Sequence, residues 1–315
     1  MKKVLVILGP TATGKTDLAL DLAKKLNGEL VSCDSRQVYK GLDIGTGKMP
    51  GKDLGFKKYD LRWEIDGTDV WMYDVADFKT QYTVKDYVNQ AEKVIEDIIN
   101  RNKLPIIVGG TGLYLKALLE GLPNLQIPVD EKLRMELEKL PLNELQEKLQ
   151  SLSPVIWKKL NESDQKNPRR LLRSIELILM NPYIKTTQKK VGIKAKYEIL
   201  KIGLTAPREI LKKRIFDRLL SRFKNGLVKE SITLNKKGLT FKRMKSLGLE
   251  YGMLAELLQK KISEEQFLQI LNTKIYQYSK RQLTWFKTDK NILWFDITGK
   301  NSRQELEKQI QKWYY

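Results

Sequence analysis

Short apolar runs recur along the chain, and stretches with helical periodicity separate them. In 83–100, for example, the apolar residues include Val84, Tyr87, Val88 and Ala91. Runs of this kind are typical of buried parallel strands, and their alternation with helices indicates a parallel α/β sheet. The predicted strands cover 3–8, 29–33, 104–110, 197–204 and 292–297, and the predicted helices cover 16–26, 83–100, 207–223, 263–287 and 302–313.

The middle of the chain has a different character. From 129 to about 181, Leu and Ile recur at helical spacing, charged faces repeat, and prolines at 128, 141, 154 and 168 punctuate the pattern. These features predict a small all-helical insertion domain over 126–189. The core domain then comprises 1–125 and 190–315, including the C-terminal helices.

Between the first strand and the first helix, 9–16 read GPTATGKT, which fits G-x-x-x-x-G-K-[ST] at every fixed position. The glycines let backbone N–H groups point inward, and the following helix N-terminus favours an anion. Lys15 supplies a positive charge, and the Thr16 hydroxyl is a candidate Mg²⁺ ligand. We therefore expect a P-loop NTPase-like parallel sheet flanked by helices. Its diphosphate site comprises Gly9, Pro10, Thr11, Ala12, Thr13, Gly14, Lys15 and Thr16. The carrier of the phosphates stays open: ATP, GTP or the diphosphate of another alcohol.

Asp34 directly follows the second predicted strand. In open α/β sheets the carboxyl ends of strands face the ligand crevice, so Asp34 is expected near the bound phosphates. It is a candidate general base or Mg²⁺ partner; the alternative is a turn or N-cap aspartate.

Composition narrows the chemistry. The chain of 315 residues has 58 basic and 38 acidic residues, a net charge of +20, which favours a polyanionic partner or reflects a lysine-rich surface. With one cysteine, Cys33, and no histidine, an internal disulfide, a Cys/His zinc site and histidine catalysis are excluded. No apolar run reaches about 18 residues, so we expect no transmembrane helix and a cytoplasmic monomer.

Blocks of sequence spread over most of the chain resemble the tRNA dimethylallyltransferase (tRNA isopentenyltransferase) family, bacterial type. The resemblance rests on GPTATGKT, on SCDSRQVYKGLDIGTGK (32–48), on PIIVGGTGLY (105–114), on NPRRLLR (167–173) and on SKRQLTWF (279–286). It implies transfer of a dimethylallyl group from dimethylallyl diphosphate to N6 of the adenine next to the anticodon of tRNA. Diphosphate would leave with Mg²⁺.

The resemblance also implies residue roles. Asp34 would take the N6 proton, and Thr13, Lys15 and Thr16 would stabilise the leaving diphosphate with help from Arg214 and Arg218. The target adenine would be held by Asp34, Ser35, Arg36 and Gln37, with Thr111 along the channel. The anticodon stem-loop would contact Arg169, Arg170, Leu171, Leu172, Arg173, Arg243, Lys245, Lys280 and Arg281.

Other interpretations remain for some of these residues. Arg214 and the arginines of 169–173 also fit solvated helix faces, and Trp285 and Phe286 are more typical of a core than of base stacking. The competing functions are a small-molecule P-loop kinase, an isopentenyltransferase for free adenine nucleotides, and a non-catalytic RNA-binding protein. The abundance of basic residues and the 279–286 block argue against the first of these.

Overall fold

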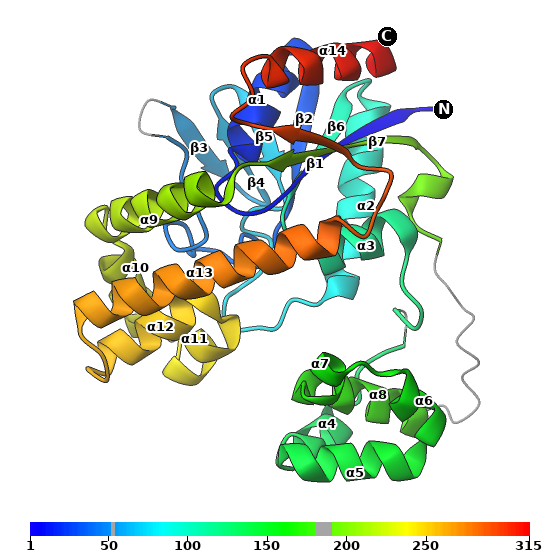
Figure 1. The fold of residues 1–315 in the computed structure, drawn as a ribbon, viewed down its shortest axis with the longest axis vertical. Helices are drawn as coiled ribbons and strands as arrows, with labels where there is room; N and C mark the ends of the chain where they lie inside the picture. The colour runs from blue at the N-terminus through cyan, green and yellow to red at the C-terminus, as the bar shows by residue number, and fades with distance from the viewer. Residues whose placement is uncertain (52–53, 126, 181–190) are drawn as a thin grey trace. The chain divides into compact units, whose positions relative to one another are not determined.

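The computed structural model describes residues 1–51, 54–125, 127–180 and 191–315 (Figure 1). This part of the chain forms two compact units, Met1–Leu119 with Gly192–Tyr315 and, separately, Glu120–Val191. The helical insertion expected over 126–189 lies inside the second unit, and residues 181–190 lie outside the described part. The first unit contains the sheet.

Within the described residues, eight strands form one sheet in the order β3-β4-β5-β2-β6-β1-β7-β8. Neighbouring strands from β5 to β8 are parallel, which confirms the predicted fold class, whereas β3 and β4 add an antiparallel hairpin at one edge. The apolar pattern does not reveal this hairpin because all four residues of β3 are exposed. The strands are β1 Lys3–Leu8, β2 Gly28–Cys33, β3 Phe56–Tyr59, β4 Arg62–Ile65, β5 Thr68–Trp71, β6 Leu104–Gly109, β7 Glu198–Thr205 and β8 Leu293–Asp296.

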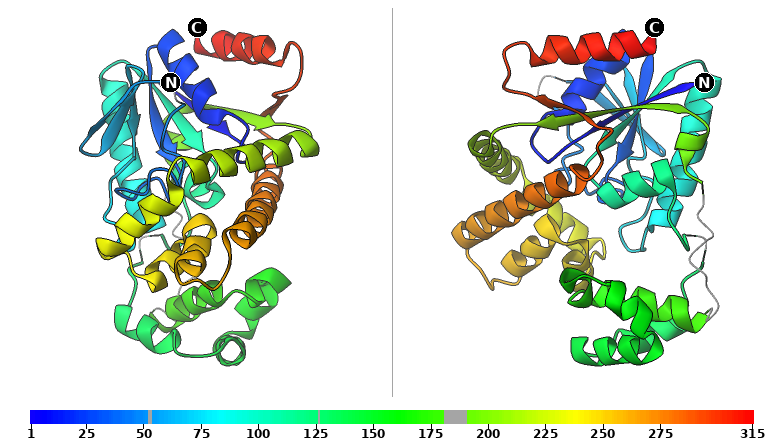
Figure 2. Two further views of the ribbon diagram at one scale, coloured as in Figure 1. Left: turned by 90° about the vertical axis from the view of Figure 1, so that its left-hand side faces the viewer. Right: turned by 45° about the vertical axis from the view of Figure 1, so that its right-hand side comes forward.

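Helices cover both faces of the sheet in the first unit. α1 and α14 share a buried cluster with one face, and α2 packs against β2 and β6 from the other (Figure 2). The helices of this unit are α1 Lys15–Lys25, α2 Val84–Asn100, α3 Gly112–Glu120, α9 Arg208–Lys224, α10 Leu227–Lys236, α11 Phe241–Leu247, α12 Leu249–Leu258, α13 Glu264–Phe286 and α14 Ser302–Tyr314, with a 3₁₀ turn at Ile193–Ala195.

The second unit consists of short helices around a small core of its own. Leucines and isoleucines of α5 and α8 form the centre of this core. Its helices are α4 Glu131–Leu137, α5 Leu142–Leu152, α6 Pro154–Lys159, α7 Glu162–Gln165 and α8 Pro168–Met180. Throughout the described ranges, none of the helices has the length and apolar character needed to span a bilayer.

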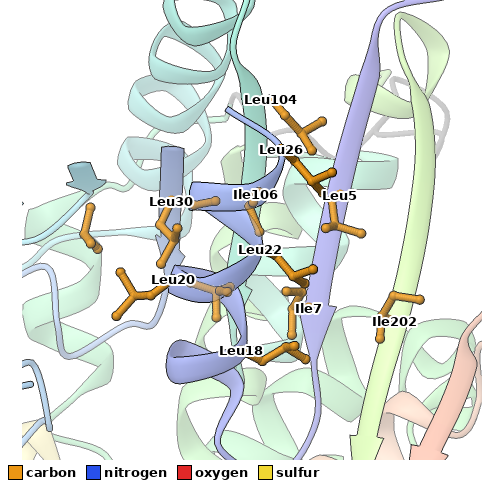
Figure 3. Close-up of a cluster of buried hydrophobic side chains, with 14 of the residues drawn as sticks. Leu5, Ile7, Leu18, Leu20, Leu22, Leu26, Leu30, Leu104, Ile106 and Ile202 are labelled. Carbon is orange, nitrogen blue, oxygen red and sulfur yellow. The ribbon is translucent and has the colours of Figure 1, made fainter. Parts of the chain in front are cut away.

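The face of the sheet under α1 shows why the predicted helix and strands pack together. Leu18, Leu22 and Leu26 lie on one side of α1 and point toward Leu5 and Ile7 of β1 (Figure 3). All five side chains are almost completely buried. Burying a leucine stabilises the folded state by about 2 kcal/mol, so this row fixes α1, and with it the P-loop, on the sheet.

Strand register brings the predicted site residues to one edge. In the parallel pairs, Leu8 lies opposite both Gly109 and Gly203, and Cys33 lies opposite Gly109. The residues that follow these strand ends therefore meet at the carboxyl edge of the sheet, as Asp34 was expected to do.

A buried ion cluster stabilises the other end of β2. The Glu29 carboxylate, in a residue 1 % exposed, accepts hydrogen bonds from Arg101 (2.5 and 2.7 Å), from Lys103 (2.7 Å) and from Trp71 Nε1 (2.7 Å). Burial alone would raise the pKa of Glu29, but the hydrogen bonds from Arg101, Lys103 and Trp71 outweigh it and lower the pKa to about 2. The cluster ties β2 to β5 and to the segment after α2.

We predict that Glu29→Gln lowers the free energy of unfolding at pH 7 by about 2 kcal/mol, because the charged hydrogen-bond acceptor of two partly exposed cations and of Trp71 is lost. The native pKa lies below the ordinary value of 4.5. The difference in free energy of unfolding between wild type and Glu29→Gln is therefore complete above pH 4.5, the ordinary pKa. It disappears as the pH falls toward the pKa of Glu29 in the folded protein. Urea unfolding at several pH values measures this. Asp97→Asn is the control, since Asp97 pairs with the same Arg101 at the surface and its loss should cost less than about 0.5 kcal/mol. A constant difference between wild type and Glu29→Gln down to pH 2 would contradict the prediction.

Candidate active site

The P-loop adopts the expected anion-binding conformation between β1 and α1. Gly9, Ala12 and Gly14 all have positive φ (141°, 68° and 77°). A side chain at Gly9 is impossible, because its Cβ would lie 2.4 Å from the carbonyl oxygen of Leu204. The loop backbone therefore curls tightly against the ends of β1 and β7, and the N-terminus of α1 follows it directly.

Thr13 is a buried residue of the P-loop. It is 2 % exposed and does not line the pocket described below, and its hydroxyl donates to the Pro10 carbonyl at 2.9 Å. The predicted catalytic role of Thr13 stays a prediction, and the structure gives its hydroxyl a bond within the loop. The residue braces the loop from inside, where a small hydroxyl side chain satisfies a buried carbonyl.

A cavity of about 330 Å³ opens above the P-loop at the carboxyl edge of the sheet. All its walls belong to the first unit, and they combine the phosphate loop with the segments after β2 and β6 and with α9, α12 and α13. The lining residues are Thr11, Lys15, Thr16, Asp34, Ser35, Arg36, Gln37, Gly45, Thr46, Gly47, Tyr73, Val108, Gly109, Gly110, Arg218, Arg222, Gly248, Leu249, Glu250, Ile275, Tyr278 and Gln282.

Asp34 lies in this cavity wall with its carboxylate fixed by the following turn. Its Oδ1 accepts from the backbone N–H of Arg36 at 2.8 Å and of Gln37 at 3.4 Å. The negative charge of Asp34 also raises the pKa values of Lys15 and Arg218, against larger effects in the opposite direction. A carboxylate and two cations therefore share one small cavity.

The surroundings of the two cations disfavour their charged forms and lower their pKa values. Burial, and then repulsion from Arg218, lower the pKa of Lys15 to about 7, and its ammonium donates to the Pro10 carbonyl at 2.7 Å. Burial, and then Arg222, lower the pKa of Arg218 to about 9, and this guanidinium donates to the Thr11 hydroxyl. Concentrated, partly desolvated positive charge of this kind favours binding of a polyanion such as diphosphate.

Arg214 does not reach the cavity. It is exposed on α9, whereas Arg218 and Arg222, one and two helical turns further on, line the wall. The role of Arg214 stays a prediction that the cavity lining does not support, and Arg222 was missed. All three lie four residues apart on one helix face, so the spacing alone could not show which pair faces the cavity.

Gln282 is a second residue that the sequence did not single out, although its block was recognised. From α13, its Oε1 accepts from the Thr11 N–H and its Nε2 donates to the Gly110 carbonyl, both at 2.9 Å. It thus joins the P-loop to the end of β6. Gly110 must be glycine because a Cβ there would lie 2.2 Å from Gln282 Nε2.

The predicted adenine-binding residues lie at the cavity. Asp34, Ser35, Arg36 and Gln37 line it, and Thr111 accepts from the Ser35 N–H at 3.2 Å. Gln37 is held in one orientation, since its Oε1 accepts from the Ser32 hydroxyl at 2.7 Å.

Cys33, next to Asp34, is 1 % exposed, and burial raises the pKa of its thiol to about 12. It is therefore neutral and not a nucleophile.

Several predicted RNA-contacting residues have structural partners instead. Leu171 and Leu172 are 0 % and 6 % exposed in the core of the second unit, so the prediction that they contact tRNA is wrong. Arg173 pairs with the buried Glu176 at 3.2 Å and donates to the carbonyls of Asn124 and Ile127.

Arg243 likewise serves the fold. It donates to the carbonyls of Phe78 and Thr80 and to the hydroxyl of Tyr39, whose ring it also covers. These contacts use its guanidinium to join α11 to the segment after β5. Most of its N–H donors therefore serve the fold, and contact of Arg243 with tRNA stays a prediction.

The remaining predicted contacts are at the surface. Lys280 and Arg281 are exposed on α13, and Arg281 lies over the Tyr278 ring. Other exposed cations have acidic neighbours within their own unit, namely Lys245 with Glu256 and Arg170 with Asp164. Arg169 is exposed on α8.

The aromatic pair that closes α13 divides between core and surface. Phe286 is core, as expected, whereas Trp285 is 40 % exposed. Its indole covers Gly112 so closely that a Cβ there would lie 2.3 Å from Trp285 Cδ1. The expectation of a core residue is therefore right for Phe286 and wrong for Trp285.

A P-loop at the edge of a parallel sheet, with two arginines and a fixed carboxylate around one polar cavity, defines a P-loop protein that binds a phosphorylated small molecule. Comparison with known proteins identifies the family. Residues 37–289 match the model of the IPP transferase family, and residues 2–58 match that of isopentenyl transferases. The chain belongs to the IPP transferase family, which confirms the resemblance.

Its relatives are similar over nearly their whole length. "tRNA dimethylallyltransferase 2" of Treponema denticola is 42% identical over 288 residues, which cover 90% of this chain and 91% of that protein. A "tRNA dimethylallyltransferase" of Bacillus mycoides is 34% identical over 98% of this chain and 95% of its own.

Solved structures agree with this relationship. The full-length tRNA isopentenylpyrophosphate transferase of Bacillus halodurans superimposes with a TM-score of 0.71 at 31% identity, covering 100% of this chain and 97% of that one. A eukaryotic dimethylallyltransferase described as acting on tRNA gives a TM-score of 0.77 at 25% identity, covering 99% and 80%.

The lowered pKa of Lys15 predicts that diphosphate binding takes up a proton. Above pH 7 the lysine of the empty site is largely neutral, and a bound anion restores its charge. Affinity for magnesium pyrophosphate should then fall by up to about tenfold per pH unit above pH 7. Calorimetry at pH 8 in buffers of different ionisation enthalpy measures the uptake, which Lys15→Met should abolish. The exposed Lys24→Met is the control. Equal uptake by wild type and Lys15→Met would contradict this assignment.

Proposed function

We propose that this enzyme transfers a dimethylallyl group from dimethylallyl diphosphate to N6 of an adenine next to the anticodon of tRNA. The observation that carries the proposal is that the P-loop and the Asp34 carboxylate open into the same cavity. An anion site for the leaving group and a carboxylate for the incoming amine are the two elements that this reaction needs. Family membership and relatives named tRNA dimethylallyltransferase support it.

The chemistry follows from the charges around the cavity. The N6 nitrogen forms a bond to the first carbon of the allyl group while the bond from that carbon to the diphosphate oxygen breaks. Asp34 accepts the N6 proton, and Lys15 and Arg218 stabilise the negative charge gained by diphosphate. Val108, Ile275 and Tyr278 provide less polar wall that keeps water from the allylic carbon.

Mg²⁺ fits this site as a partner of the diphosphate. Within the described ranges, no group of three or more His, Cys, Asp or Glu residues could hold a metal ion by itself. Mg²⁺ commonly binds through one or two protein oxygens together with phosphate oxygens and water. The Thr16 hydroxyl lines the cavity and can supply such an oxygen. A bound ion would neutralise part of the charge on the leaving diphosphate.

The partners follow from the same proposal. An adenine in a folded anticodon loop reaches a cavity of this kind only when it is turned out of its stack. The net charge of +20 favours the RNA backbone as a ligand, and we propose a monomer acting in the cytoplasm.

We predict that purified enzyme with Mg²⁺ transfers label from dimethylallyl diphosphate to unmodified tRNA and not to AMP. Asp34→Asn keeps an acceptor for the turn that follows but cannot take a proton, so turnover should fall by about 10²–10⁴-fold. Transfer of label to AMP alone would reassign the chain to nucleotide modification. ATP consumption with a small alcohol and no transfer would favour a kinase.

The matched control is Asp77→Asn. Asp77 accepts from the Lys79 N–H at 2.7 Å in a similar turn, but it lies outside the cavity. Its variant should turn over normally, and Asp34→Asn should bind tRNA as well as wild type does. Near-normal turnover by Asp34→Asn would reject Asp34 as the base.

Arg173 and Lys280 should affect tRNA binding differently. Arg173 is committed to Glu176 and to two carbonyls, so Arg173→Ala should leave the slope of log K against log [salt] unchanged. Lys280 is exposed, and if it contacts a phosphate Lys280→Ala should reduce that slope by about one. Filter binding across a salt series measures both. A reduction of that slope by about one in Arg173→Ala would instead support the prediction that Arg173 contacts tRNA.

A further inference from the structure

Part of the cavity wall is built from backbone rather than from side chains. The segment Asp43–Lys48 contributes Gly45, Thr46 and Gly47 to the lining. Its carbonyls hold two other lining residues in place: Gly45 accepts from Arg222 Nη1 at 3.2 Å, and Thr46 accepts from Gln37 Nε2 at 3.3 Å. The position of this segment therefore sets the positions of polar groups that face the substrate.

The Glu230 carboxylate on α10 holds the segment from behind. Oε2 accepts from the N–H groups of Asp43 at 3.0 Å and Ile44 at 2.6 Å, and Oε1 accepts from that of Gly45 at 3.1 Å. The Tyr251 hydroxyl donates to Oε1 at 2.7 Å. Three successive amides around one carboxylate form an internal anion site, and charge-assisted bonds of this kind are among the stronger ones.

These contacts close into a ring. The Gly45 carbonyl accepts from Arg222, and Arg222 pairs with Glu250 at 3.6 Å. Tyr251, the next residue in the chain, donates to Glu230, which in turn accepts from the Gly45 N–H. The helices involved are α9, α10 and α12, and α10 packs against both of the others (Figure 1). Gly45, Arg222 and Glu250 line the cavity, whereas Glu230 and Tyr251 do not.

Two glycines of the segment leave space for the side chains of the ring. A Cβ on Gly47 would lie 1.9 Å from Arg222 Nη2, and a Cβ on Gly45 would lie 2.7 Å from the Tyr251 hydroxyl. The glycines of this segment thus allow the arginine and the tyrosine to approach the backbone. Arg222 in turn lies close enough to Arg218 to lower its pKa, after the larger effect of burial.

We propose that Glu230 is a positioning residue that holds Arg222 at the diphosphate end of the cavity without touching substrate. The proposal rests on the proposed function for the identity of the anion, which is the diphosphate leaving group. In Glu230→Gln an amide nitrogen would face backbone N–H donors, and the charge that organises three amides would be lost. Gly45 would then be free to move, and Arg222 would lose the Gly45 carbonyl and keep only its longer contact with Glu250.

The test is a double-mutant cycle between Glu230→Gln and Arg222→Gln, read first as the dissociation constant of magnesium pyrophosphate. In the wild-type background, Glu230→Gln should weaken binding by about tenfold; in the Arg222→Gln background it should change binding by less than about twofold. The kcat of transfer to tRNA should show the same coupling, with the KM for tRNA unchanged. Glu256→Gln, on α12 and partly exposed outside the cavity wall, is the matched control and should behave as wild type.

Amide hydrogen exchange separates positioning from general loss of stability. In Glu230→Gln the amides of Asp43, Ile44 and Gly45 should exchange faster, while those of β1 stay protected. If Glu230→Gln does not fold, Tyr251→Phe replaces it in the double-mutant cycle, since this variant removes one hydrogen bond to Glu230 and keeps the carboxylate. It should weaken pyrophosphate binding less than Glu230→Gln does, and again only when Arg222 is present.

Additive effects of the two substitutions, or unchanged exchange at 43–45, would overturn the proposal. Pyrophosphate binding and amide exchange need no tRNA, so they decide the role of Glu230 even if wild-type enzyme transfers nothing to tRNA. If only that transfer fails, the proposed function is rejected and the proposed role of Glu230 still stands.

Discussion

The site depends on strand ends that approach one another with no side chains between them. Gly9 lies against the carbonyl of Leu204, and Gly109 lies so close to Cys33 that a Cβ would be 2.2 Å from its carbonyl oxygen. Because β1, β2, β6 and β7 end together in this way, a loop of inward-pointing amides and a carboxylate share one small cavity. Larger residues at these two positions would force the strands apart and separate the two halves of the chemistry.

Charge is the second organising feature of the cavity. Lys15, Arg218 and Arg222 crowd together, and their proximity and burial lower the pKa values of Lys15 and Arg218. An empty site of this kind holds cations at a cost in free energy, which a bound diphosphate relieves. Glu250 offsets part of this cost, because it pairs with Arg222 and raises the pKa of Arg218 against the larger effect of burial. With no histidine in the chain, Asp34 stands out as the group able to accept a proton beside the phosphate loop.

Many of the basic residues contribute to folding as well as to net charge. Arg101 and Lys103 neutralise Glu29, Arg134 and Arg173 neutralise Glu176, and Arg243 bonds backbone carbonyls. A count of charges therefore overstates the surface that is free to bind RNA. Exposed groups such as Lys280 and Arg281 remain candidates for that role.

The sequence by itself determined the α/β class, the P-loop, the place of Asp34 and the family, because each rests on local patterns. Periodicity marks strands and helices, and a phosphate loop is a contiguous motif whose backbone conformation follows from its glycines. Only the tertiary structure decided which of Arg214, Arg218 and Arg222 face the cavity, since all three share a helix face. It likewise turned Thr13, Arg173 and Arg243 inward to carbonyl or carboxylate partners, and it brought Glu230 to the segment at 43–45, nearly two hundred residues away in the chain. Such contacts depend on how elements far apart in the sequence pack together, so no local sequence pattern predicts them.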